Sequence, residues 1–157
     1  MSTIAATLRP IPIPGAELLR KDPAAQAFML LRIAFTVAPI LFGIDKFANV
    51  LTDDWTRYLA PEFNDVIPGN AGDAMHIVGV VEIVAGLTVL FVPRFGGFLV
   101  AGWLAGIIVN LLIVGGYGDI ALRDFGLMLA ALTLARLATA YPAREDAGHE
   151  ASPHLRR

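Results

Sequence analysis

One carboxylate, Glu82, lies inside a long stretch from His76 to Val92 that is otherwise almost wholly apolar. In a bilayer such a residue is costly, and by default it marks a functional site. Glu82 could contact a small molecule such as a quinone, or it could take up and release a proton. Alternatively, it could pair with a cationic side chain and fix the register of two helices. Each interpretation requires polar partners close to Glu82.

Other polar residues near the ends of apolar stretches are candidate partners. The predicted ligand-binding set is Glu82, Lys46, Asn110, His76, Arg123 and Asp45. The competing interpretations are a hydrogen bond between helices for Asn110, a solvated position at the interface for His76, and a membrane-surface anchor for Arg123. No metal site is predicted, because an i, i+6 spacing does not bring His76 and Glu82 to one ion, whereas i, i+3 or i, i+4 would.

The composition favours a membrane protein. Of the 157 residues, 56% are hydrophobic and 17% are charged, and the mean hydropathy is +0.64. Soluble domains carry about 25% charged residues. A net charge of −2 argues against binding to nucleic acid, which needs clustered lysine and arginine. Because the chain contains no cysteine, its own residues cannot form disulfides, ligate iron–sulfur clusters or perform thiol redox chemistry.

Four apolar stretches are each close to the roughly 20 residues that cross about 30 Å of hydrocarbon. The predicted spans are about 27–47, 75–92, 95–114 and 124–140. The turn at Pro93 and Arg94 is so short that the second and third spans should form a tight antiparallel hairpin. A soluble four-helix protein would need a charged face on each helix, and residues 95–114 contain no charge. We therefore predict an all-α fold, a transmembrane four-helix bundle with antiparallel up-down topology.

The connection from residue 48 to 74 is predicted to lie outside the membrane. It should contain a short interfacial helix between Thr52 and Leu59, N-capped by Thr52 or Asp53 and ended by Pro61. With four spans, nine lysine and arginine residues lie on the side of both termini and three on the other. The positive-inside rule then makes both termini cytoplasmic.

This topology predicts three regions and a location. Residues 1–26 form a cytoplasmic N-terminal segment, 27–141 the transmembrane domain, and 142–157 a disordered cytoplasmic tail. The expected location is a bacterial cytoplasmic (inner) membrane. The polar residues of the predicted site then share the outer half of the bundle.

Small residues predict which helix faces pack. The glycines assigned to helix packing are Gly43, Gly79, Gly86, Gly102, Gly106 and Gly126. Gly102 and Gly106 form a small-xxx-small motif, which lets another backbone approach closely. This motif is compatible with packing inside the bundle and with packing between two copies of the chain.

Several short motifs resemble those of the DoxX-like family of small four-helix membrane proteins. They are Arg32 at the opening of the first span, Gly43-Ile-Asp-Lys46-Phe47 at its end, Glu82-x-x-x-Gly86, the turn at Pro93-Arg94, and the polar end of the third span. The resemblance covers about residues 27–140. The family takes its name from a subunit of a membrane-bound thiosulfate:quinone oxidoreductase, so the resemblance implies an association with membrane redox chemistry.

Three hypotheses on function follow. The first is an accessory membrane subunit that docks a redox partner and contributes a quinone or small-ligand pocket, without a covalently bound cofactor. The second is a small-solute or proton-coupled carrier in which Glu82 is alternately protonated. The third is a structural assembly subunit. The sequence contains no catalytic motif of its own. The expected partners are the bilayer and a protein of a membrane complex. A homo-oligomer is also compatible with the sequence.

Overall fold

Helices account for all the regular secondary structure in the described part of the chain, so the all-α prediction is confirmed. The computed structural model describes residues 16–64 and 69–141. Its elements are α1 (Ala16–Lys21), α2 (Pro23–Ala48), the 3-10 helix η1 (Thr56–Tyr58), α3 (Pro61–Asn64), α4 (Ala71–Phe91), α5 (Pro93–Val114) and α6 (Gly118–Leu137). The predicted tail 142–157 and much of the predicted segment 1–26 lie outside the described residues.

The first long helix, α2, begins earlier than predicted because two start signals lie side by side. The Asp22 side chain accepts a hydrogen bond from the backbone N–H of Ala24 at 2.9 Å, which caps the helix. Pro23 occupies the first turn, where its missing N–H would have no partner in any case. The helix ends at Asn49, whose left-handed backbone (φ 51°) is one that asparagine tolerates.

Val92 alone separates α4 from α5, which confirms the predicted short turn. Asn70 and Asp73 form a capping box at the start of α4, with hydrogen bonds of 3.1 and 3.0 Å. Pro93 stands in the first turn of α5, a position that proline favours. These signals place both helix starts before the predicted residues 75 and 95.

The helix predicted between Thr52 and Leu59 is shorter in the structure. η1 covers only Thr56–Tyr58, and its N-cap residue is Trp55, not Thr52 or Asp53. Asp54 Oδ1 accepts a hydrogen bond from the N–H of Thr56 at 2.9 Å. Pro61 does not end a helix; it begins α3. We call residues 49–60 the strap.

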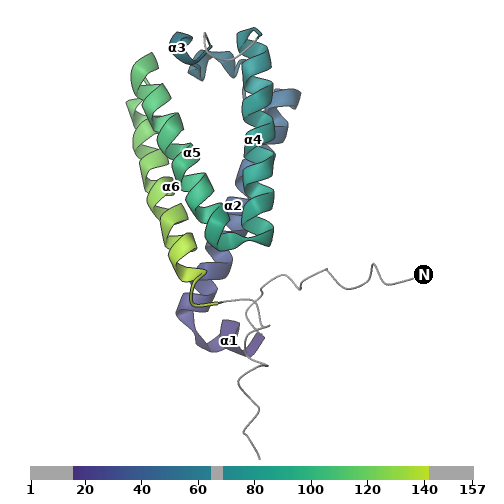
Figure 1. The fold of residues 1–157 in the computed structure, drawn as a ribbon, viewed down its shortest axis with the longest axis vertical. Coiled ribbons are helices and arrows are strands. Elements are labelled where there is room, and N and C mark those ends of the chain that lie inside the picture. Colours follow the sequence, from purple (N-terminus) through teal and green to yellow (C-terminus); the bar gives the residue numbers. More distant parts are fainter. Residues whose placement is uncertain (1–15, 65–68, 142–157) are drawn as a thin grey trace, which may run out of the picture.

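The four long helices form two closely packed pairs. α2 packs along α4, and α5 packs along α6. The pairs meet near Val92 and diverge toward the strap (Figure 1). We refer to these two ends of the molecule as the Val92 end and the strap end.

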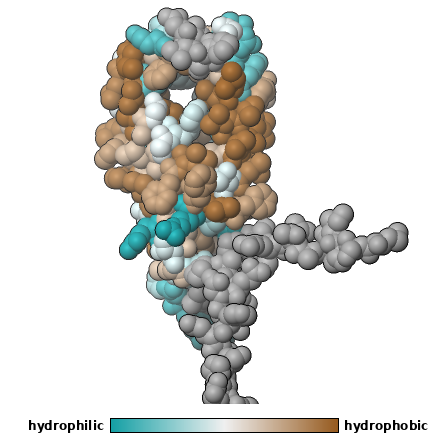
Figure 2. Space-filling view, in the orientation of Figure 1, coloured by the Kyte–Doolittle hydropathy of each residue, from teal (hydrophilic) through white to brown (hydrophobic). Residues whose placement is uncertain are grey.

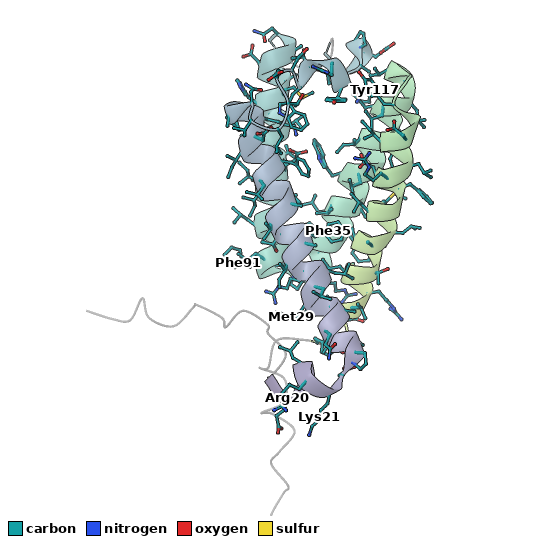
Figure 3. All side chains as sticks on the ribbon, turned by 180° about the vertical axis from the view of Figure 1, so that it is seen from behind. Arg20, Lys21, Met29, Phe35, Phe91 and Tyr117 are labelled. Atoms are coloured by element: carbon teal, nitrogen blue, oxygen red, sulfur yellow. The ribbon has the colours of Figure 1, made fainter. Side chains whose placement is uncertain are left out.

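The apolar core fills the half of the molecule where the two pairs meet. It contains Phe28, Phe35, Ala85, Val89, Val100, Ala101, Ala131, Leu134 and Ala138. Phe35 is labelled in Figure 3. Also in this half, the buried Arg32 donates a hydrogen bond to the carbonyl of Leu90, in the last turn of α4, where a cation complements the helix dipole.

Three of the helices, α2, α4 and α5, are long and apolar enough to cross a membrane by length and composition. α6 is not among them: it has a similar length but carries Asp119, Arg123, Asp124 and Arg136. The structure thus contains three candidate spans and does not confirm the predicted fourth at 124–140. Its large apolar side chains are widely exposed, among them Leu30, Leu41, Phe95, Leu112 and Leu122, a surface compatible with lipid.

Glycines bring α2 and α4 into close contact, as predicted for Gly43, Gly79 and Gly86. A Cβ added at Gly43 would lie 2.5 Å from the carbonyl oxygen of Gly79, and one at Gly79 would lie 2.7 Å from that of Gly43. A Cβ at Gly86 would lie 2.8 Å from the carbonyl oxygen of Thr36. The backbones therefore touch along one face of each helix.

Gly43→Ala should lower the stability of the folded protein by about 1–3 kcal/mol, the usual cost of overpacking, because neither backbone can move without separating the helices. Gly126→Ala is the matched control, since a Cβ there meets no described heavy atom within 4 Å and alanine favours helix. The measurement is thermal unfolding of both variants in the same detergent. Equal melting temperatures for Gly43→Ala and the native protein would contradict this close contact.

The prediction that Gly102, Gly106 and Gly126 mediate packing is wrong within the chain. A Cβ at any of them would meet no described atom within 4 Å. On α5 the packed face instead contains Gly96, which meets the backbone of Val89, and Gly97, which meets α6. A small-xxx-small motif indicates that another helix can approach closely, but it does not determine which face of the helix packs.

Asp22 also connects the two described ends of the chain. The hydroxyl of Tyr141 donates a hydrogen bond to Asp22 Oδ2 at 2.5 Å, and its ring stacks on Phe28 with centroids 5.3 Å apart. The hydrogen bond from Tyr141 has the largest effect on the pKa of Asp22, and the one from Ala24 N–H has the next largest; together they hold this pKa below its ordinary 3.8. The same bond to Asp22 raises the pKa of Tyr141 above its ordinary 10.0.

Tyr141→Phe should raise the pKa of Asp22 toward its ordinary value while the ring stack with Phe28 is kept. Because the folded-state pKa is the lower one, the stability that the ionised Asp22 contributes is present above about pH 4 and is lost as the pH falls through the folded-state pKa. Carbon-detected NMR of the Asp22 carboxyl in both proteins measures the shift. Identical titration curves would show that the hydroxyl does not act on Asp22.

Candidate functional site

Lys46 and Glu82 form a buried ion pair between α2 and α4. Lys46 Nζ lies 2.7 Å from Glu82 Oε2, and the two side chains are 5% and 11% exposed. Gly79, one turn before Glu82, lies against Gly43 and against the Cβ of Lys46. The close backbone contact therefore places the two charges at the same level. The structure brings these two predicted site residues together.

The strap supplies a second partner for Lys46. Lys46 Nζ lies 4.1 Å from the centroid of the Trp55 ring. A cation over the face of an indole is attracted by its negative quadrupole. The ammonium group is therefore held between the carboxylate of Glu82 and the strap.

Asp45, predicted to bind ligand, instead holds the first part of the strap on α2. Its Oδ1 accepts hydrogen bonds from the backbone N–H groups of Val50 (2.9 Å) and Leu51 (3.0 Å). Its Oδ2 accepts one from Trp55 Nε1 at 3.0 Å. Both carboxylate oxygens are thus engaged by the protein itself.

Asn110 holds the other end of the strap on α5. Its Oδ1 accepts a hydrogen bond from the N–H of Ala60 at 2.8 Å, and its Nδ2 donates one to the carbonyl of Tyr58. The Tyr58 ring also packs against Tyr117, with centroids 5.1 Å apart; Figure 3 shows Tyr117 at the strap end. Asn110 therefore joins a helix to the strap, not a helix to a helix as one interpretation of the sequence has it.

His76 is exposed and lies outside the ion pair. Its ring stacks on Phe47, with centroids 4.8 Å apart and planes 5° apart. It lines a surface pocket of about 190 Å³ together with Lys46, Trp55 and the two acidic residues Asp53 and Asp54. In the described residues no group of three or more histidine, aspartate or glutamate side chains could hold a metal ion.

Arg123 is exposed and is not brought to Glu82. Its neighbour Asp124 is partly buried and close enough to interact electrostatically with Glu82. On α6, Asp124 shares a face with Ala131 and Ala135, which are buried. That run of small residues is the sequence signal that Asp124, not Arg123, points inward.

Trp103, on α5, is the other residue of the site that the sequence did not reveal. Its indole lies beside the Glu82 carboxylate. Its Nε1 is buried and faces the Glu82 carboxylate, beyond the limits of a well-formed hydrogen bond. Two features hide Trp103 in the sequence. It lies between Gly102 and Gly106, in a motif that predicts packing, and tryptophan counts as an apolar residue although its indole N–H is a hydrogen-bond donor.

All four long helices therefore contribute a polar group to one level of the molecule. These are Lys46 from α2, Glu82 from α4, Trp103 from α5 and Asp124 from α6. The face in Figure 2 is hollowed between α5 and α4 below the strap, with apolar flanks. We call this space the hollow. The level of the four polar groups contains an ion pair, a further carboxylate and an indole N–H, a set that can hydrogen-bond a carbonyl or handle a proton.

No protein-family model, no curated protein and no solved structure matches this chain. The resemblance to the DoxX-like family therefore stays a prediction.

Proposed function

We propose that this chain is an accessory membrane subunit of a quinone-linked redox complex, in which the hollow takes a small lipophilic molecule of the quinone class. In this proposal α6 is the fourth span of a DoxX-like four-helix bundle in a bacterial inner membrane. Both termini are cytoplasmic, and the strap is on the outer side.

The observation that carries the proposal is the buried Lys46–Glu82 pair, with the indole N–H of Trp103 beside Glu82. An ion pair with a purely structural role does not require a further donor on a third helix. In this proposal a ligand carbonyl in the hollow accepts a hydrogen bond from Trp103 or Lys46.

A quinone matches the chemistry of these groups. Its carbonyl oxygens accept hydrogen bonds, and its ring and tail are apolar, as are the flanks of the hollow. Glu82 and Asp124 could exchange protons with it. The chain has no cysteine, so in this proposal a partner protein supplies the redox centre.

One observation favours a second function, a proton-coupled carrier. Two carboxylates, Glu82 and Asp124, act on each other electrostatically, while Lys46 pairs with Glu82 and Arg123 acts on Asp124. In a medium of low dielectric constant, a proton taken up by either carboxylate would relieve their mutual repulsion.

Purification from the native membrane in a mild detergent, followed by mass spectrometry, separates these functions. An accessory subunit should co-elute with a redox protein and a quinone, and Glu82→Gln should keep the protein partner because it preserves the shape of the site. A carrier should lose transport and its pH response in Glu82→Gln. If Glu82→Leu left both assembly and activity intact, no working pocket would exist.

A further inference from the structure

The surface pocket beside His76, which we call the strap pocket, has the room and the lining to hold water. Three segments line it: the end of α2, the strap and the start of α4. Its polar lining includes Asn49, Asp53, Asp54, Thr56 and His76. Its volume of about 190 Å³ far exceeds the space that one water needs, roughly 10–15 Å³. Asp53, Asp54 and His76 are exposed, so the pocket opens to solvent at its rim.

Lys46 connects the strap pocket with Glu82. Its side chain is buried and lines the pocket, and its Nζ donates a hydrogen bond to Glu82 Oε2 at 2.7 Å. An ammonium group has three N–H donors. Among the described residues, Lys46 Nζ has this one hydrogen bond and the contact with the Trp55 ring. Its remaining donors can therefore bond to water in the pocket, and a single side chain separates that water from Glu82.

The seam between α2 and α4 is closed on the other side of Glu82, toward the Val92 end. One turn beyond Glu82, a Cβ added at Gly86 would lie 2.8 Å from the carbonyl oxygen of Thr36. Two turns beyond it, Val89 is fully buried in the apolar core. Tight backbone contact and apolar packing leave no room for water along this part of the seam. The polar route to Glu82 along α2 and α4 therefore comes from the strap end.

We propose that the strap pocket is the aqueous entrance through which Glu82 exchanges protons with solvent at the strap end, and that Lys46 is the relay. To protonate Glu82, the Lys46 ammonium gives one proton to the carboxylate across their hydrogen bond. The resulting amine takes up one proton from a hydronium ion in the pocket, which becomes water. The reverse sequence releases a proton. This assignment rests on the proposed function, in which Glu82 exchanges protons, and adds the side from which they come.

The charges on and next to this route favour the arrival of cations. The titratable groups are Asp45 on α2, Asp53, Asp54 and Arg57 on the strap, His76 and Glu82 on α4, and Asp124 on α6. Carboxylates outnumber cationic side chains among them, and two of them stand at the rim of the pocket. A cleft lined by one sign of charge raises the local concentration of the opposite ion. Hydronium should therefore be enriched at the rim.

Single cysteines test whether water enters the pocket, because the native chain has none. The reagent MTSET carries a permanent positive charge and reaches a thiol through water. Met75 lines the pocket and is 7% exposed, whereas its neighbour Ala74 is 0% exposed, lies closer to the helix start and is not part of the lining. Met75→Cys should therefore react about tenfold faster than Ala74→Cys, since thiol reactivity follows access. Intact mass spectrometry of the full-length protein in dodecyl maltoside measures both rates.

Blocking the pocket tests the relay. The chain has two lysines, Lys21 and Lys46, so ¹⁵N-lysine labelling gives two ammonium signals whose hydrogen exchange with water NMR can measure. MTSET bound to Met75→Cys fills the pocket and should slow this exchange at Lys46 about tenfold. The exposed Lys21 should exchange as before. Thr56→Cys, also in the lining, replaces Met75→Cys if that variant does not fold.

The outcomes separate this assignment from the function on which it rests. Equal rates of modification in Met75→Cys and Ala74→Cys would overturn the entrance, and so would unchanged exchange at Lys46 after the pocket is blocked. Decylubiquinone binding by the native protein tests the function independently. Slower exchange at Lys46 in the blocked protein, together with no quinone binding by the native protein, would support the entrance and overturn the quinone-linked function, leaving the proton-coupled carrier.

Discussion

Glu82→Leu should destabilise the folded protein by about 3–5 kcal/mol, because it leaves the Lys46 ammonium buried without its carboxylate. Lys46 is 5% exposed on its side chain and lies 2.7 Å from Glu82. The Trp55 ring cannot replace a full negative charge. Lys46→Met should cost a similar amount by leaving Glu82 unpaired.

The double variant Lys46→Met/Glu82→Leu should recover most of this loss. Replacing both members of a buried pair by apolar residues of similar volume is often neutral or stabilising, because neither charge then has to be desolvated. Thermal unfolding of the native protein, the two single variants and the double variant in one detergent gives the coupling energy. A double variant whose loss equals the sum of the two single losses would show that the charges do not interact.

Asp45→Ala should release the first part of the strap from α2. Three donors lose their common acceptor: the N–H groups of Val50 and Leu51 and the indole N–H of Trp55. A hydrogen bond to a charged group contributes about 1.5–3 kcal/mol. Amide hydrogen exchange at Val50 and Leu51 should therefore accelerate about thirtyfold, which corresponds to about 2 kcal/mol.

Two variants control for a general loss of structure. Asp54→Ala removes a carboxylate whose hydrogen bonds stay within the strap, so exchange at Val50 and Leu51 should not change. Asn110→Leu should accelerate exchange at Ala60 and leave Val50 unaffected. If Asp45→Ala protected these amides as well as the native protein does, Asp45 would not hold the strap.

The helices could be predicted because their signals are local. The apolar stretches mark α2, α4 and α5, and Pro93 marks the single joint between α4 and α5. The early start of α2 follows from Asp22 and Pro23, which apolar content alone does not detect. For α6, the charges at its two ends, Arg136 among them, separate it from the other three by composition.

The ion pair could be predicted because Lys46 and Glu82 are each a charged residue of an apolar stretch, and a buried charge is stable only next to an opposite charge. The other candidates lie closer to water, which can replace a protein partner. His76 and Arg123 can be satisfied by solvent, and the structure leaves both exposed. Asp45 and Asn110 found partners in the strap, whose path across the helix ends depends on tertiary contacts.

The face of α5 could not be predicted because the glycines on it are ambiguous. Gly96 and Gly97 at the Val92 end decide which side of the helix packs, and their contacts are with other helices, Val89 on α4 and Ala131 on α6. This rotation turns Gly102 and Gly106 outward and points the Trp103 nitrogen toward Glu82. Helical periodicity gives the angles between these residues but not the direction of the neighbouring helix.

The central claim is that the polar groups around Glu82, the indole N–H of Trp103 among them, take a quinone-class ligand. The chain has two tryptophans, so ¹⁵N NMR of the indole groups should give two side-chain signals, assigned with Trp103→Phe. On addition of decylubiquinone the Trp103 signal should move, while that of Trp55, already bonded to Asp45, should stay in place. A Trp103 signal that does not move at saturating quinone would contradict the claim.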